Sequence, residues 1–411
     1  MNDESTGVSR RKFIDSLTKA AALSTVSLTG LPSAAFAADS KKDIEADDHR
    51  FLCKPYLHSI EHAIMYIRCI TNKNSYCWVE YNEPGKPAQK AHTLSDGLVD
   101  ANNRVHEIKL TGLKPGTTYE YKVIAKEIKD FQPYKLTYGE TISSDVHSFT
   151  TFNPAAKETQ WLVLNDIHDR PASFQQLLQL NDNDPYQYVF LNGDMFDYQT
   201  DEKQIIDHLL TPCTESFAAQ KSMLFVRGNH ETRGKYARQL KDYFSAPNGA
   251  YFSFQSGPVF TIALDTGEDK EDTHPVYAGI VDFDQFRIQQ AAWLEQQLKS
   301  KACKKAKYKV VMMHIPTFYS GDAHGTLHCR ELFSSLFDKY KIDLLICGHT
   351  HTYGVHPPVA GKHNYPIIIG GGPTNGKRTL IKVHADQQSL NVLMLKDDGT
   401  EVGKYTVNPN R

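Results

Sequence analysis

The most restrictive feature of this sequence is a series of apolar runs that each end in a group of polar side chains. From residue 158 to residue 408, short apolar runs alternate with longer stretches of helical periodicity, which indicates an α/β domain. Ligands of such domains bind beyond the carboxyl ends of the strands. The five runs concerned are 161–164, 188–191, 223–226, 310–313 and 344–347. We therefore expect the polar residues that follow them to meet at one edge of a sheet.

These polar groups consist mainly of carboxylate, amide and imidazole side chains. They are Asn165-Asp166-Ile167-His168, Gly193-Asp194-Met195-Phe196-Asp197, Gly228-Asn229-His230-Glu231, His314-Ile315-Pro316 and Gly348-His349-Thr350-His351. Buried together without a common partner, such side chains would each lose roughly 1–3 kcal/mol. A shared cation removes that cost, and oxygen and imidazole ligands suit divalent Mn, Fe, Zn or Co. The candidate ligands exceed what one ion uses, which favours two ions with a carboxylate between them.

The chain of 411 residues exceeds what one hydrophobic core usually organises, so two domains are expected. Residues 50–152 alternate with a period of two between turn residues, which predicts an antiparallel β-sandwich. Within it, residues 110–119 resemble the turn into a late strand of fibronectin type III domains. Residues 158–408 would form the α/β domain. Strands are predicted at 64–68, 76–81, 105–110, 119–125 and 146–151, and helices at 172–180, 284–299 and 327–341.

The composition argues against two classes of partner. A net charge of −2 and a hydrophobic content of 40% describe an ordinary globular protein. Extended nucleic acid and anionic membrane surfaces are recognised by a basic excess, which is missing here. The composition gives no oligomeric state. Partners must therefore be inferred from the site itself.

The first 37 residues resemble a twin-arginine export signal. Arg10 and Arg11 precede a mildly apolar run, and Ala35-Phe36-Ala37 is a small-residue cleavage pattern. An amphipathic N-terminal helix is the alternative interpretation. The run is too short and too polar for a permanent membrane anchor. We expect a signal peptide over 1–37, a linker over 38–49, and a mature protein that is periplasmic or secreted.

Seven cysteines, an odd number, do not form a disulfide framework in a chain this long. Cys69 and Cys77 flank a predicted turn at 71–75, which leaves open whether they form a disulfide. The remaining five are predicted to be small core residues, as free cysteines usually are. They are Cys53, Cys213, Cys303, Cys329 and Cys347.

The ordered polar groups resemble the motifs of the calcineurin-like metallophosphoesterase superfamily. The similarity covers about residues 160–373 and rests on Asp-x-His, Gly-Asp-x-x-Asp, Gly-Asn-His-Glu, a lone histidine and Gly-His-x-His. It implies a four-layer α-β-β-α sandwich and a metal-dependent hydrolase of phosphoric esters. The ligands that it implies are Asp166, His168 and His351 on one ion, Asn229, His314 and His349 on the other, and Asp194 between them.

The same resemblance gives catalytic roles to His230 and Asp197. His230 would bind no metal and would protonate the leaving oxygen as hydroxide, generated between the two ions, attacks phosphorus. Asp197 would pair with His230 and favour its protonated form. The alternative for Asp197 is a helix N-cap or a turn residue.

The β-rich region in front of this domain, with Lys54-Pro55-Tyr56-Leu57 at its start, resembles the arrangement of purple acid phosphatases. Two positions depart from that group. His168 stands where that group lacks a histidine, and Asp197 stands where it has an iron-binding tyrosine. Tyr198 is expected to pack or, as the less favoured alternative, to contact substrate. A purple Fe(III) centre is therefore not expected.

Three further residues are candidates for substrate contact: Arg227, Arg233 and His324. For both arginines a salt bridge is the more common explanation, and His324 lies in a polar, glycine-containing loop after His314. We expect an exported phosphatase that hydrolyses small phosphate monoesters. A phosphodiesterase or nucleotidase that uses the same site is one alternative, and a catalytically silent surface-binding protein is another.

Overall fold

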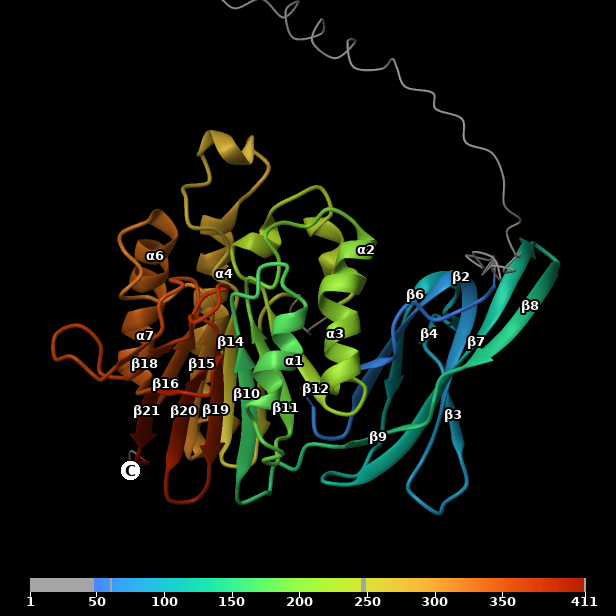
Figure 1. The fold of residues 1–411 in the computed structure, drawn as a ribbon, viewed down its shortest axis with the longest axis horizontal. Coiled ribbons are helices and arrows are strands. Elements are labelled where there is room, and N and C mark those ends of the chain that lie inside the picture. Colours follow the sequence, from blue (N-terminus) through green and yellow to red (C-terminus); the bar gives the residue numbers. More distant parts are fainter. Residues whose placement is uncertain (1–47, 60, 245–248, 410–411) are drawn as a thin grey trace, which may run out of the picture. The chain divides into compact units, whose positions relative to one another are not determined.

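A computed structural model describes residues 48–59, 61–244 and 249–409. The predicted signal peptide and nearly all of the predicted linker lie outside these ranges. No helix within them combines the length and the hydrophobicity that a lipid bilayer crossing requires. Residues from His49 onward form one compact unit, in which a β-rich region precedes an α/β region (Figure 1).

The β-rich region is an antiparallel sheet built on two long strands, β2 and β7. β2 pairs with β1, β3, β6 and β7, and β7 also pairs with β8 and β9. A separate small hairpin is formed by β4 and β5. The strands are β1 (Tyr56–His58), β2 (Met65–Asn82), β3 (Gln89–Ala91), β4 (Leu94–Ser95), β5 (Leu98–Val99), β6 (Ala101–Leu110), β7 (Thr118–Gln132), β8 (Lys135–Ser143) and β9 (His147–Thr150).

The prediction of a turn at 71–75 is wrong, because β2 continues through it. The first half of β2 pairs with β6 and the second half with β7, with a register shift between Ile70 and Ser75. The hydroxyl groups of Thr71 and Ser75 donate to the Lys73 carbonyl, which stabilises the shift. Side chains from both halves share one core, so the sheet folds over that core. Cys69 and Cys77 both belong to it, and both are free thiols here.

The α/β region contains two six-stranded sheets. The first has the order β12-β11-β10-β19-β20-β21 and the second β13-β14-β15-β16-β18-β17. The first sheet contains β10 (Thr159–Leu164), β11 (Tyr188–Asn192), β12 (Ser222–Val226), β19 (Thr379–Ala385), β20 (Leu390–Lys396) and β21 (Glu401–Val407). The second contains β13 (Phe252–Ser256), β14 (Val259–Leu264), β15 (Tyr308–Met313), β16 (Leu344–Cys347), β17 (Gly354–His356) and β18 (Ile367–Ile369).

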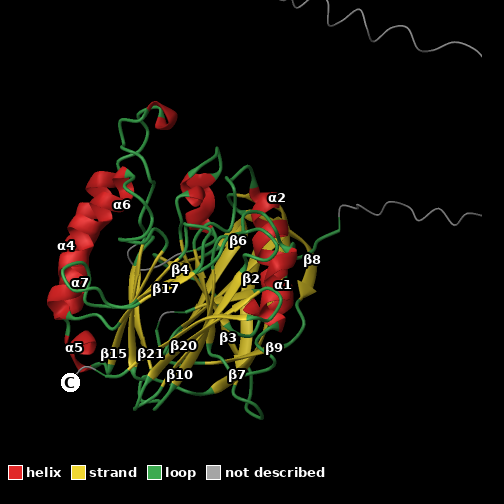
Figure 2. Ribbon diagram, turned by 60° about the vertical axis from the view of Figure 1, so that its left-hand side comes forward, coloured by secondary structure: helices red, strands yellow, loops and turns green. Residues whose placement is uncertain are grey.

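Helices cover the outer face of each sheet (Figure 2). The helices are α1 (Ala172–Gln179), α2 (Glu202–Ile205), α3 (Thr211–Cys213), α4 (Phe283–Lys299), α5 (Lys301–Lys305), α6 (His324–Cys329) and α7 (Ser335–Tyr340). π-Helical turns at Ile206–Leu210 and Thr214–Ala218 extend α2 and α3, and one at Arg330–Ser334 joins α6 to α7. Short 3₁₀ turns lie at His230–Thr232, Ala237–Asp242 and Pro275–Tyr277.

Three hydrophobic cores separate these layers. One lies between the two sheets, one between the first sheet and α1 to α3, and one between the second sheet and the helices α4 to α7. The four-layer α-β-β-α prediction is therefore confirmed, as is the β-rich front region. The strands β10, β11, β12, β15 and β16 run parallel to a neighbour within each sheet, which brings their carboxyl ends to the same edge.

The β-rich region packs against the α/β region through a shared core and buried hydrogen bonds. Cys53, Tyr56 and Ile70 belong to the same core as α1 and β12 residues. The Tyr56 hydroxyl donates to the Tyr243 carbonyl at 3.0 Å, and the Tyr121 hydroxyl donates to the Ala219 carbonyl at 2.7 Å. These contacts fix the two regions against each other.

Replacing Tyr121 by phenylalanine is expected to lower the free energy of unfolding by about 1–3 kcal/mol, because the Ala219 carbonyl would lose its buried donor. Denaturant unfolding measures this change. Tyr134→Phe removes the same hydroxyl from a side chain that is 102% exposed and should leave stability unchanged. Equal effects of the two substitutions would contradict this role for Tyr121.

Candidate metal centre

The five polar groups meet at the edge where the strands end, and unusual backbone conformations turn their side chains inward. Five of the seven predicted ligands have a positive φ: Asp166 (52°), His168 (49°), Asp194 (56°), His349 (73°) and His351 (55°). Each such non-glycine residue costs roughly 1–3 kcal/mol, and such residues gather at functional sites. The loops support one another, because the amides of Asp166 and His168 donate to the carbonyls of Gly193 and Asp194 at 3.0 Å.

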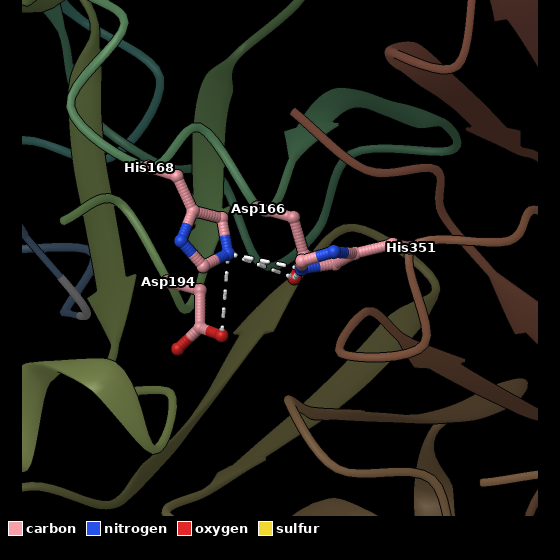
Figure 3. A group of neighbouring side chains, drawn as sticks. All are labelled: Asp166, His168, Asp194 and His351. Carbon is pink, nitrogen blue, oxygen red and sulfur yellow. Dashed lines mark hydrogen bonds and ion pairs between the residues drawn. The ribbon is translucent and has the colours of Figure 1, made fainter. Parts of the chain in front are cut away.

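The first cluster consists of Asp166, His168, Asp194 and His351 (Figure 3). The Nε2 atoms of His168 and His351 lie 3.0 Å apart, so two imidazole nitrogens face the same point. Oδ1 of Asp166 lies 3.3 Å from the His351 nitrogen and 3.7 Å from the His168 nitrogen. This oxygen is buried without a protein hydrogen-bond partner. Four donor groups therefore converge on one small volume.

The second cluster consists of Asp194, His314 and His349, so Asp194 belongs to both. Nε2 of His314 lies 2.9 Å from Oδ2 of Asp194. Nδ1 of His349 lies 2.9 Å from the amide oxygen of Asn229, which adds a fourth oxygen or nitrogen donor. The structure thus brings all seven predicted ligands together, in the two groups that the resemblance implied, with Asp194 at their junction.

The two carboxylates make this site attractive to positive charge. Asp166 and Asp194 are both buried. Burial acts to raise the pKa of Asp166, but His314 and the other imidazoles outweigh it, so the pKa is lowered. Burial acts to lower the pKa of His314, but Asp194 and Asp166 raise it to about 10. The buried carboxylates therefore draw in a proton at His314.

Hydrogen bonds behind the clusters fix how the imidazoles point. Nδ1 of His168 donates to Oδ1 of Asp197 at 2.8 Å, and Nδ1 of His314 donates to the Asn192 carbonyl at 2.9 Å. In both rings Nδ1 holds a proton, so Nε2 is the nitrogen that faces the cluster and would bind an ion, in His314 after releasing the proton that the carboxylates attract. This arrangement is the usual support of a metal-binding histidine.

The prediction that the Asp197 carboxylate pairs with His230 is wrong. The carboxylate contacts His168, and His230 is bound instead by the main chain of Asp197, whose carbonyl accepts from Nδ1 at 2.7 Å. The backbone carbonyl of Asp197 already accepts from Nδ1 of His230, which leaves the carboxylate to accept from Nδ1 of His168. Asp197 therefore positions His168.

His230 stands beside the clusters without joining either donor set around Asp194. Its Nε2 lies 4.0 Å from Oδ2 of Asp194 and 3.0 Å from Nη1 of Arg233. Its ring packs edge-on against His168, with 4.6 Å between the centroids. Burial lowers the pKa of His230, and the Arg233 charge adds to this against the opposing effect of Asp194.

Both candidate arginines form salt bridges. Nε of Arg227 donates to Asp265 at 2.6 Å. Arg233 donates to Glu268 through Nε at 2.8 Å and Nη2 at 2.9 Å. The sequence analysis missed these two acids, although Asp265 directly follows the apolar strand β14 and so carries the same signal as the other groups. Only Arg233 contacts His230, so it is the arginine that borders the centre.

His324 lies in a different cluster, with Asp284 and His328. Its Nε2 is 2.8 Å from Oδ1 of Asp284, and Nδ1 of His328 is 3.0 Å from the same oxygen. Nη1 of Arg287 also lies 2.9 Å from that oxygen and balances its charge. Among the described residues, the polar contacts of His324 are to Asp284, so the structure gives it no contact with the centre.

Glu231, the last residue of the Gly-Asn-His-Glu motif, supports the loops that carry the ligands. Its buried carboxylate accepts from the backbone amides of Asp194, Met195 and Gly228 at 2.7–2.8 Å, and from Phe196 at 3.2 Å. Burial and the Asp194 charge raise the pKa of Glu231 to about 7, against the effect of these donors. The motif could have pointed to Glu231, but three of its four amide donors, those of Asp194, Met195 and Phe196, lie in the loop after β11.

Glu231→Gln is expected to lower the free energy of unfolding by about 1–3 kcal/mol and to reduce the amount of bound metal, because an amide donor would face backbone donors. Denaturant unfolding and elemental analysis of the purified variant measure the two effects. Glu331→Gln, at an exposed helical position, is the matched control. Wild-type stability and metal content in Glu231→Gln would contradict the supporting role.

Divalent cations fit this centre. The donors are carboxylate, amide and imidazole groups, and thiolates are missing from both clusters. A carboxylate shared by two groups of donors is the arrangement that a pair of ions requires. Gly228 and Gly348 allow it, because a Cβ atom at either position would collide with the carboxylate of Asp194 or Asp166. Fold and donor set together define a metallophosphoesterase domain.

Comparison with known proteins identifies the family. Residues 160–353 match the model of the calcineurin-like phosphoesterase family, and this part of the chain is a calcineurin-like metallophosphoesterase domain. The chain is 23% identical over 291 residues to purple acid phosphatase 21 of Arabidopsis thaliana, covering 66% of this chain and 59% of that protein. The chain therefore spans about three fifths of that relative's length.

Solved structures show the same fold. The purple acid phosphatase PPD1 of yellow lupin (Lupinus luteus) superposes with a TM-score of 0.66 at 16% identity, covering 86% of this chain and 74% of that one. PhoD superposes with a TM-score of 0.59 at 12% identity, covering 88% of this chain and 92% of that one. Both alignments extend beyond the 160–353 domain, so the likeness in fold includes more than the metallophosphoesterase core.

Proposed function

We propose that this protein is an exported phosphatase that hydrolyses small phosphate monoesters with two divalent cations. The observation that carries the proposal is the sharing of Asp194 between two clusters of buried donors. The similarity to purple acid phosphatases supports the monoester assignment. The Arg10-Arg11 signal pattern supports export by the twin-arginine route to the periplasm or the medium.

In this proposal Asp166, His168 and His351 hold one ion, and Asn229, His314 and His349 hold the other, with Asp194 between them. Mn, Fe, Zn or Co suit these ligands. Such a pair of ions lowers the pKa of a water molecule toward neutrality and polarises phosphoryl oxygens. Asp197 keeps the proton of His168 on Nδ1, so that Nε2 stays available as a ligand.

His230 is the proposed general acid. The hydrogen bond from its Nδ1 to the Asp197 carbonyl fixes the ring and leaves Nε2 toward the centre. In the protonated imidazole, Nε2 would donate its proton to the departing ester oxygen. Arg233, held by Glu268 and 3.0 Å from that nitrogen, would contact the negative phosphoryl group.

The function is tested by metal analysis of the purified protein together with rates on p-nitrophenyl phosphate and bis(p-nitrophenyl) phosphate. About two metal ions per chain and a preference for the monoester are expected. Removal of metal by a chelator should abolish hydrolysis, and added divalent metal should restore it.

A strong preference for the bis ester would replace the monoesterase by a phosphodiesterase or nucleotidase. Bound metal without hydrolysis of either ester would instead favour a catalytically silent surface-binding protein. The intact set of candidate ligands, together with His230, argues against that second outcome.

A further inference from the structure

A cavity of about 600 Å³ opens beside the metal centre on the side of His349. Its walls come from three segments. Tyr319 and Ser320 follow β15, a second segment runs from His349 after β16 to His356 at the end of β17, and Ile369 ends β18. None of the residues that line it is a carboxylate or a lysine or arginine. The cavity therefore suits an uncharged group that is attached to a phosphate at the centre.

Tyr319 has an unusual backbone in this cavity. Its φ is 70°, in the left-handed region that bulky residues avoid. Holding tyrosine there costs roughly 1–3 kcal/mol, so the surrounding structure must stabilise it. The side chain belongs to none of the hydrophobic cores and is 37% exposed. Core packing therefore does not explain this conformation.

Three neighbours hold the Tyr319 ring: His356, His363 and Lys362, whose Nζ lies over the ring 5.2 Å from its centroid. It stacks on the His356 ring with 3.8 Å between the centroids and an angle of 10° between the planes. Its hydroxyl donates to Nε2 of buried His363 at 2.8 Å, and Nδ1 of His363 donates to the Tyr365 carbonyl at 2.7 Å. Each polar atom of this chain of contacts has a partner. The stacked pair is thus a fixed aromatic wall of the cavity.

We propose that the Tyr319–His356 pair stacks against a planar aromatic leaving group of the phosphate ester. The inference rests on the proposed phosphatase function and names a substrate class for it. Aromatic rings attract one another beyond their buried area by about 0.5–1.5 kcal/mol, which corresponds to roughly two- to tenfold in affinity. A phenolic group and a nucleobase share this chemistry. The serine and threonine hydroxyls of the cavity add hydrogen-bond partners for either.

The affinities of two small phosphonates for the metal-loaded enzyme test the Tyr319–His356 pair as a stacking platform. They do not depend on leaving-group reactivity. Phenylphosphonate should bind roughly two- to tenfold more tightly than methylphosphonate. Tyr319→Asn removes the ring and keeps a residue that tolerates the left-handed backbone, so it should remove this preference. Tyr319→Phe keeps the ring without its hydroxyl and should retain the preference. Metal content and methylphosphonate affinity should stay within about twofold of wild type in both variants.

A second pair of ligands distinguishes the two sources of an aromatic group. If the enzyme prefers AMP to ribose 5-phosphate by a factor in affinity similar to its preference for phenylphosphonate over methylphosphonate, the platform accepts nucleobases. A gain for the phenyl compound alone restricts it to smaller rings, and both results support the platform.

Equal affinity of wild type for the phenyl and methyl compounds, or an unchanged preference in Tyr319→Asn, would overturn the platform and leave the phosphatase intact. Failure of the metal-loaded protein to bind either phosphonate would overturn both proposals.

Discussion

Asp194→Asn is expected to reduce phosphatase activity by about 10³-fold, since several kcal/mol of charge stabilisation would be lost. Asp194 is the residue that the two clusters share, and its Oδ2 lies 2.9 Å from Nε2 of His314 and 3.6 Å from Nε2 of His168. An asparagine has no negative charge to hold two cations close together. Bound metal should fall from about two ions per chain to one or fewer. Elemental analysis and steady-state rates measure both effects.

Two further substitutions calibrate this result. Asp197→Asn acts through the orientation of His168 and should reduce metal affinity by about 10–100-fold. Asp182→Asn, at an exposed loop position that also has a positive φ, should change neither metal content nor rate. An Asp194→Asn protein that keeps two ions and wild-type turnover would rule out a shared carboxylate.

His230→Ala is expected to lower turnover by about 10²–10⁴-fold while metal content stays near wild type. The His230 ring is bound through the Asp197 carbonyl and contacts Arg233, and it belongs to neither of the two donor groups that meet at Asp194. Although His230 also lies near His168 and Asp197, its loss should remove a proton donor and leave the seven proposed ligands in place. Turnover should fall most for esters of poor leaving groups, which need a proton the most.

A comparison of two esters distinguishes a general acid from a residue with a purely structural role, because loss of a structural residue would lower the turnover of both esters equally. For p-nitrophenyl phosphate, whose leaving group departs as a stable anion, the loss in His230→Ala should be smaller than for an alkyl phosphate. Release of metal from the variant, or equal losses for both esters, would show that His230 does not act as the general acid.

The centre differs at two positions from the purple acid phosphatases that the chain resembles. Asp197 stands where that group has its iron-binding tyrosine, and here it positions His168, a residue that the group lacks. Tyr198 is 55% exposed, so the expectation that it packs is wrong. Because Asp197 stands at the position of that tyrosine, iron-loaded protein should show no tyrosine-to-iron charge-transfer colour.

Much of the centre could be predicted because its signal is local. Each candidate ligand directly follows an apolar strand, and parallel strands bring such positions to a common edge. The strand ends after β10, β11, β12, β15 and β16 were therefore recognisable one at a time. The continuous strand β2 could not be predicted, because the polar residues at 71–75 are typical of a turn. Only their place between the segments that pair with β6 and β7 shows that the strand continues.

The partners of individual side chains were decided by the tertiary structure. Sequence motifs placed Asp197 and His230 in the same site but could not tell which imidazole the carboxylate would reach, because that depends on how the loops after β10, β11 and β12 lie against one another. The same holds for the other candidates. Arg227 and Arg233 form salt bridges with acids that follow β14, and His324 of α6 pairs with Asp284 of α4, so each partner depends on how these elements pack.

The sequence by itself determined which apolar strands lead into the centre, which chemical groups stand at their ends and hence what kind of ion they suit, because these follow from periodicity and residue type. Only the tertiary structure decided which donors share Asp194, which imidazole each acid orients and where an aromatic wall adjoins the centre. Some of these contacts join residues more than 100 positions apart, such as His349 and Asn229, and the energy of each depends on distances that no local pattern records.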